Sequence, residues 1–150
     1  MLKLLTEEDI PAVVELGRHF LDASPYSNLE FSEAAARRSL QLCLLQPEKN
    51  ICILSENEEG VIVGALLGAV TSLPFSDDLV AAEIAWWVEP SHRKGSAGLR
   101  MKEAYEYWAR KMGAKKISMA LLSGPYEDKL DKYYRSSGFQ KAETAYVRDT

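Results

Sequence analysis

The eight residues "SHRKGSAG", numbered 91–98, combine two basic side chains with a run of residues that have almost no side-chain bulk. They lead into residues 97–112, where the apolar spacing is helical. The first N–H groups of a helix lack intrahelical partners and lie at the positive end of the helix dipole. Small residues would let an anion approach those groups, and Arg93 and Lys94 would add positive charge beside it.

The same stretch also has a purely structural explanation. Gly95 would form the turn, Ser96 would cap the helix through its hydroxyl, and Gly98 would let the helix pack closely on a sheet. The residue pattern does not separate this explanation from an anion site, and both interpretations stay open.

A second candidate for chemistry is Glu83, which lies in the apolar stretch "AAEIAWWVEP" at residues 81–90. Burial disfavours a charged carboxylate and raises its pKa toward neutrality, which suits a general base acting directly or through a water molecule. With strict strand alternation, Glu83 shares a face with Ala85, Trp87 and Glu89. The alternative is a solvent-facing glutamate on a half-exposed strand.

The elements that position these residues follow from the periodicity of the chain. Helices are expected over residues 6–21, 33–46, 97–112 and 128–137, and strands over residues 1–5, 80–89 and 115–122. Residues 50–73 read as a β-hairpin with its turn at Glu58–Gly60, and residues 139–149 have room for one or two final strands. The element order is therefore β-α-α-β-β-β-α-β-α-β, an α/β or α+β mixture.

The strand at 80–89, the helix at 97–112 and the strand at 115–122 form a β-α-β unit, which implies two parallel neighbouring strands. Ligands of such units bind at the carboxyl ends of the strands. The stretch at residues 91–98 lies at that place.

Composition excludes several classes of protein. The 150 residues suit one domain, with 47% hydrophobic and 27% charged residues. No apolar run is long enough to span a membrane and the amino-terminal residues do not resemble a signal peptide, so we expect a cytoplasmic protein. The net charge of −4 argues against nucleic acid as a partner. Cys43 and Cys52 have no metal-type spacing, and we expect free, buried thiols and no metal site.

Two stretches of this chain resemble the GNAT superfamily of N-acetyltransferases. The segment "VEPSHRKGSAGLRMKEAYEYWA", Val88 to Ala109, is similar to the loop that binds the pyrophosphate of acetyl-CoA, with Ser96 in place of the first glycine of the pattern. The segment "YYRSSGF", Tyr133 to Phe139, resembles the end of the last helix in that superfamily. The order of elements matches along nearly all 150 residues.

The resemblance implies a single GNAT acetyltransferase domain over residues 1–150. Its fold would be a central, mostly antiparallel mixed sheet of six to seven strands with a parallel β-α-β unit, flanked by about four helices. It also implies transfer of an acetyl group from acetyl-CoA, as co-substrate, to a primary amine by direct attack in a ternary complex.

The resemblance further implies roles for particular residues. Those that would bind the cofactor are Arg93, Lys94, Gly95, Ser96, Ala97 and Gly98, with the main chain of Trp87 and Val88 near the acetyl group and the pantetheine arm. Tyr134 would protonate the departing thiolate through its hydroxyl group, and the alternative is that Tyr134 only packs the last helix on the sheet. Glu83 is the candidate base.

The acceptor stays open between a small molecule and a peptide amine, with no membrane partner, and the resemblance admits a homodimer. A catalytically silent acyl-CoA-binding or protein-interaction module on the same fold is the alternative function. Neither His19 nor His92 is assigned to catalysis or to a metal.

Overall fold

Five strands form one sheet in the order β1-β2-β3-β4-β5. The computed structural model describes residues 1–150 and divides them into two units, residues 1–120, which contain the sheet, and residues 121–150. The strands are β1 (Leu2–Leu4), β2 (Asn50–Glu56), β3 (Ile62–Ser72), β4 (Leu79–Val88) and β5 (Lys116–Ser118). The α-helices are α1 (Ile10–Ala23), α2 (Glu33–Leu45), α3 (Ala97–Lys111) and α4 (Glu127–Ser136), and two short 3-10 helices are η1 (Glu7–Asp9) and η2 (Pro90–His92).

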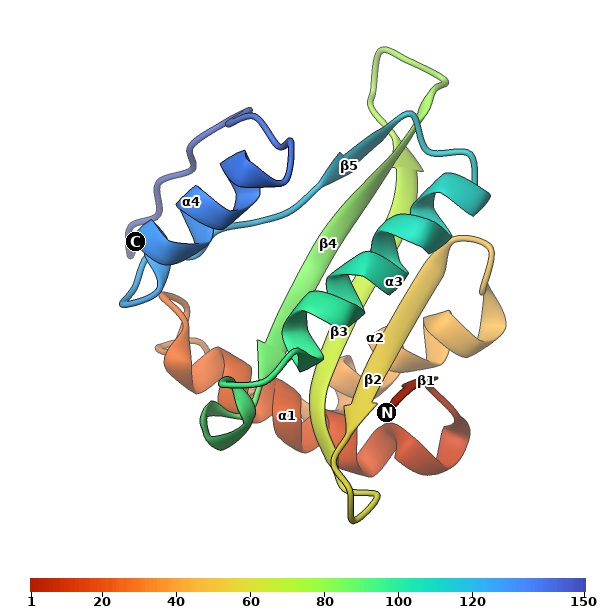
Figure 1. The fold of residues 1–150 in the computed structure, drawn as a ribbon, viewed down its shortest axis with the longest axis vertical. Coiled ribbons are helices and arrows are strands. Elements are labelled where there is room, and N and C mark those ends of the chain that lie inside the picture. The colour runs from red at the N-terminus through yellow and green to blue at the C-terminus, as the bar shows by residue number, and fades with distance from the viewer. The chain divides into compact units, whose positions relative to one another are not determined.

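The sheet is mixed, as the sequence predicted. Strands β1 to β4 pair antiparallel in chain order, and β4 pairs with β5 in parallel. Helix α3 is the crossover between those two parallel strands (Figure 1). The four α-helices and the parallel β-α-β unit are confirmed.

Helices cover both faces of the sheet. Helices α1 and α2 lie on one face and α3 on the other (Figure 1). Alternation along β2 supplies both interfaces, because Cys52 and Leu54 belong to the core under α1 and α2, whereas Ile51 and Ile53 belong to the core under α3. Each face of this strand is therefore buried, which explains its continuous apolar run.

The hairpin predicted at Glu58–Gly60 is confirmed. Strands β2 and β3 flank it, the Asn57 N–H donates to the Val61 carbonyl at 2.9 Å, and Gly60 has a φ of 78°. A residue with a side chain is disfavoured at this φ, so glycine suits the turn.

The predicted number of strands was wrong, because the sheet has five strands rather than six or seven. Residues 139–149, where one or two final strands were expected, form no strand, and most of their side chains are exposed. A strand is stable when a neighbour pairs its N–H and C=O groups and one of its faces is buried. Residues 139–149 pair with no strand and bury no face, so their composition alone does not produce a strand.

No helix combines the length and the apolar character that crossing a membrane requires.

Candidate functional site

A β-bulge interrupts β4 next to Glu83, the residue predicted to act as the general base. Leu67 of β3 pairs with Ala85 and the next residue, Gly68, pairs with Glu83, so Ile84 is an extra residue without a partner across the ladder. The alternation along β4 therefore changes phase at residue 84, so Glu83 does not share a face with Ala85 and Trp87 as strict alternation would require. Ala85 and Trp87 face α1, whereas Glu83 lies beside Gly68 on the face covered by α3.

Glu83 lies where β4 and β5 separate. The parallel pairing ends at Ala82 with Ser118, and the Ala120 N–H beyond the end of β5 donates to Glu83 Oε2 at 3.0 Å. Burial raises the pKa of Glu83 to about 7, although the hydrogen bond from Ala120 opposes this shift. No salt bridge to a Lys or Arg offsets the burial of this carboxyl group, so near neutral pH it can both take up and release a proton.

Tyr105 of α3 lies next to Glu83, on the face of the sheet that α3 covers. A Cβ atom on Gly68 would lie 2.7 Å from the Tyr105 ring, so the missing side chain of that glycine makes room for the aromatic ring. The Tyr105 hydroxyl donates to the Ser118 carbonyl at 3.1 Å. Burial, with a further contribution from the Glu83 charge, raises the pKa of Tyr105, which stays a neutral hydrogen-bond donor. Tyr105 thus fixes the end of β5 next to Glu83.

The stretch at residues 91–98 forms a turn and the first residues of α3, as predicted. Ser96 precedes the helix, but its side chain makes no capping hydrogen bond, so the capping role considered for its hydroxyl is wrong. The first turn of α3 holds no acidic residue, and Lys94 and Gly95 are exposed just before it. A Cβ atom on Gly95 would contact nothing within 4 Å. The turn before α3 is therefore exposed where the positive end of the helix dipole lies.

Gly98 packs closely on the sheet. A Cβ atom on Gly98 would lie 3.2 Å from the Trp86 ring, so the packing explanation holds for this glycine. The Nε1 atom of Trp86 is buried and has no hydrogen-bond partner. A buried donor without a partner is rare and costs stability.

Strand β5 pairs only with residues 80–82 of β4, so the later residues of β4 have no β5 partner on that edge. Main-chain groups at the end of β4 point toward this edge. The Glu89 N–H donates to the Val63 carbonyl at 2.8 Å, and hydrogen-bonded residues alternate along an antiparallel ladder. The main-chain groups of Val88 therefore point away from β3, and its carbonyl accepts a hydrogen bond from Arg93 Nε at 2.7 Å. The same alternation turns the main chain of Trp87 toward β3, where Ala65 is its partner, so the main-chain role expected for Trp87 is not open to a ligand in this register.

The Trp87 side chain lies between two partners. The Arg93 guanidinium lies 4.4 Å from the centre of its ring, and Phe20 of α1 packs edge to face at 6.3 Å. Trp87 also lines a small apolar cavity of about 60 Å³ between α1 and the sheet. The other lining residues are Val13, Leu16, Gly17, Phe20, Ala65, Leu67 and Ala85.

Tyr134 belongs to the unit of residues 121–150. It is the buried residue of α4, and its ring packs on Phe139 with a centroid distance of 5.8 Å, whereas the neighbouring Tyr133 is half-buried. Gly138 ends this helix with a φ of 91°, as predicted.

The two cysteines are free and buried, as expected. Burial raises the pKa of the Cys43 thiol to about 11 and raises that of Cys52 further. Neither thiol is a ready nucleophile near neutral pH. No group of three His, Cys, Asp or Glu side chains is arranged to hold a metal ion.

Comparison with known families identifies the class of protein that this fold and site define. The model of the acetyltransferase (GNAT) family matches residues 15–139, and the chain belongs to that family. A comparison with curated protein sequences found no match.

Solved structures agree with this fold. An acetyltransferase from Trypanosoma brucei is 19% identical, with a TM-score of 0.74, and the alignment covers 100% of this chain and 99% of that one. An aminoglycoside 6'-N-acetyltransferase from Acinetobacter haemolyticus is 16% identical, with a TM-score of 0.73 and coverage of 100% and 97%. A ribosomal-protein-alanine N-acetyltransferase from Brucella melitensis is 15% identical, with a TM-score of 0.70 and coverage of 100% and 99%.

Sequence reasoning missed three parts of this site. It did not find that Tyr105 lies next to Glu83, that Arg93 stacks on Trp87, or that His19 contacts Glu89. The first has a trace in the sequence, because a glycine at position 68 inside a strand often marks the close approach of another group. The contact of His19 with Glu89 joins residues 70 positions apart and has no local pattern.

Proposed function

We propose that the chain is an acetyl-CoA-dependent N-acetyltransferase that acts as a single domain over residues 1–150. It would acetylate a primary amine of a small molecule or a peptide by direct attack in a ternary complex. The observation that carries this proposal is Glu83, a half-buried carboxyl group where β4 and β5 separate, whose pKa is raised to about 7 by desolvation. A carboxyl group that loses solvent without a cationic partner costs stability, and a pKa raised in this way is typical of a site that uses the group.

The residues at the start of α3 fit the pyrophosphate of acetyl-CoA. Gly95 and Ser96 are small, exposed residues just before the first turn, and Arg93 and Lys94 supply positive charge at the same place. Ala97 and Gly98 add two small residues in the first turn. When bound, acetyl-CoA supplies the thioester whose acetyl group is transferred.

The chain's own groups would then divide the proton transfers. Glu83, about half ionised at neutral pH, would take the proton from the attacking amine, directly or through a water molecule. The main chain of Val88, at the edge that β5 leaves open, would bind the cofactor near its reacting end, with the Trp87 side chain behind it. Tyr134 is proposed to protonate the departing thiolate. The raised thiol pKa of both cysteines is consistent with transfer that forms no acyl-enzyme.

Acetyl-CoA binding tests the cofactor site. Acetyl-CoA is expected to raise the melting temperature of the wild-type protein, and Arg93→Glu is expected to abolish most of that increase. The matched control is Arg110→Glu, which makes the same charge change at an exposed position near the end of α3. Absence of any wild-type shift would overturn the proposed function.

Acetyl transfer tests the catalytic assignment. Primary amines are incubated with enzyme and acetyl-CoA, and free thiol is measured. The amines include an aminoglycoside and a peptide with an amino-terminal alanine, because similar structures are acetyltransferases named for these acceptors. Glu83→Gln and Tyr134→Phe should each lower kcat by about 10- to 1,000-fold while acetyl-CoA still binds. Full activity in both variants would refute their roles, and binding without turnover of any amine would favour the silent acyl-CoA-binding module.

A further inference from the structure

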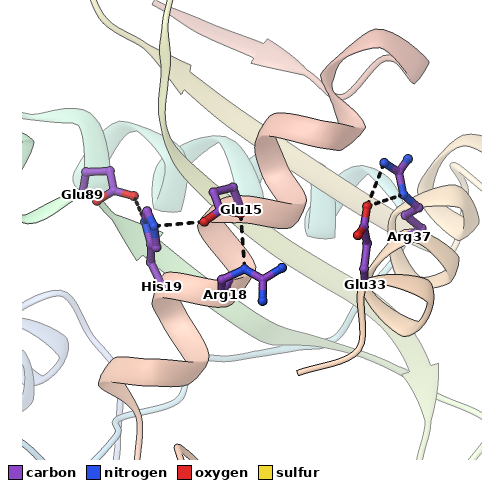
Figure 2. A network of polar contacts seen from close by, with 6 residues as sticks. All are labelled: Glu15, Arg18, His19, Glu33, Arg37 and Glu89. Atoms are coloured by element: carbon purple, nitrogen blue, oxygen red, sulfur yellow. Dashed lines mark hydrogen bonds and ion pairs between the residues drawn. The ribbon is translucent and has the colours of Figure 1, made fainter. Parts of the chain in front are cut away.

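An ion pair joins α1 to the end of β4. His19 Nδ1 lies 2.5 Å from Glu89 Oε1, and Glu89 is the residue between β4 and η2, at the start of the turn that leads to the loop at residues 93–98. Figure 2 shows His19 between Glu89 and Glu15, whose Oε1 lies 3.5 Å from His19 Nε2. The imidazole is therefore held from both of its nitrogen atoms.

Glu89 connects this ion pair with the aromatic wall of the site. The same Oε1 atom accepts a hydrogen bond from Trp87 Nε1 at 3.4 Å. Phe20, next to His19 on α1, packs against Trp87 with the two rings perpendicular, and the Arg93 guanidinium lies over the Trp87 ring. A continuous series of contacts thus runs from His19 through Glu89 and Trp87 to the first residue of the loop.

We propose that His19 is a positioning residue for the cofactor loop. By holding Glu89 and Trp87, it keeps Arg93 and the adjoining main chain ordered before acetyl-CoA arrives. A loop that is already ordered loses less conformational freedom on binding, so His19 increases affinity without contacting the ligand. This inference rests on the proposed function, in which the loop binds acetyl-CoA.

The charges around His19 determine how the effect depends on pH. Glu89, Glu15 and Asp22 face His19, while Arg18 pairs with Glu15 at 3.3 Å. The hydrogen bond with Glu89 is the main cause that raises the pKa of His19. Because the pKa is raised in the folded protein, the ion pair is complete at pH below about 6.5 and weakens as the pH rises through the raised value. Positioning should therefore be strongest in mildly acidic solution.

Calorimetric titration of the full chain with acetyl-CoA measures the effect on affinity. His19→Gln is expected to raise the Kd by about three- to tenfold at pH 6 and by a smaller factor at pH 9. The matched control, Glu15→Gln, removes the more distant carboxylate partner and keeps Glu89, so its Kd should stay within about twofold of the wild type. The ratio of variant to wild-type Kd is the readout, since the phosphates of the cofactor titrate equally in both measurements.

Amide hydrogen exchange of residues 88–96 without any ligand tests positioning itself. His19→Gln should exchange faster there than both the wild type and Glu15→Gln. Unchanged exchange would overturn the inference, even if affinity fell. Faster exchange with an unchanged Kd would also overturn it, because the order of the loop would then not matter for binding. If the wild type binds no acetyl-CoA, the proposed function fails. In that case the exchange rates alone decide the role of His19: faster exchange in His19→Gln than in the wild type shows that His19 orders residues 88–96, and unchanged exchange shows that it does not.

Discussion

Replacing Glu83 by glutamine is expected to stabilise the protein at alkaline pH. Burial raises the pKa of Glu83 from 4.5 to about 7, so the folded protein binds this proton more tightly than the unfolded chain does. The contribution to stability is therefore fully present below the unfolded value of 4.5. It is lost progressively as the pH rises and is gone above the folded value of about 7.

The size of the loss follows from the pKa change. At about 1.4 kcal/mol per pH unit, a pKa raised from 4.5 to about 7 corresponds to about 3 kcal/mol of unfolding free energy. Glutamine carries no charge at any pH and keeps an oxygen atom for the Ala120 N–H, which donates to Glu83 at 3.0 Å. Glu83→Gln should thus be more stable than the wild type by about 3 kcal/mol at pH 8.5 and by less than about 1 kcal/mol at pH 5.

Urea denaturation of both proteins at the two pH values, followed by circular dichroism, measures this difference. Glu103→Gln is the matched control, because Glu103 is exposed on α3 and its replacement should change stability by less than about 0.5 kcal/mol. An equal gain for Glu83→Gln at both pH values, or no gain at pH 8.5, would show that folding does not raise the pKa of Glu83. The argument for its role as a base would then fail.

Two further predictions concern catalysis and packing. With an amine that the enzyme accepts, kcat/KM should rise with pH through about 7 in the wild type, and Glu83→Gln should lose the part of this rise that does not come from the amine. A pH profile with the same shape in both proteins would exclude Glu83 as the base. Gly68→Ala should cost about 1–3 kcal/mol in urea denaturation, because its Cβ atom would lie 2.7 Å from the buried Tyr105 ring. Gly95→Ala, whose Cβ atom meets nothing within 4 Å, should cost much less, and equal costs would contradict the close packing.

Much of the fold could be predicted because its pattern is local. Helical spacing, the hairpin turn with Gly60 and the helix end at Gly138 are properties of neighbouring residues, and all three are present in the structure. The number of strands could not be predicted in this way. Residues 139–149 have a composition that permits a strand, but a strand forms only where a partner edge and a buried face are available.

The candidate site also has parts that the sequence predicts and parts that it does not. The small residues before α3 and the basic residues beside them are adjacent in the chain, and their expected place at the start of the helix is confirmed. The bulge at Ile84 could not be derived from β4 alone, because it depends on the register with β3 and moves Glu83 to the opposite face from Ala85.

The sequence by itself determined the types of residue that can do chemistry, the order of the elements and the place of the loop between β4 and α3. Only the tertiary structure decided which groups surround them. The pKa of Glu83 is raised because α3 and the end of β5 cover it, and His19 meets Glu89 because the sheet brings residues 70 positions apart within hydrogen-bonding distance. Burial and long-range contacts depend on packing between elements, and packing is not encoded in any short stretch of the chain.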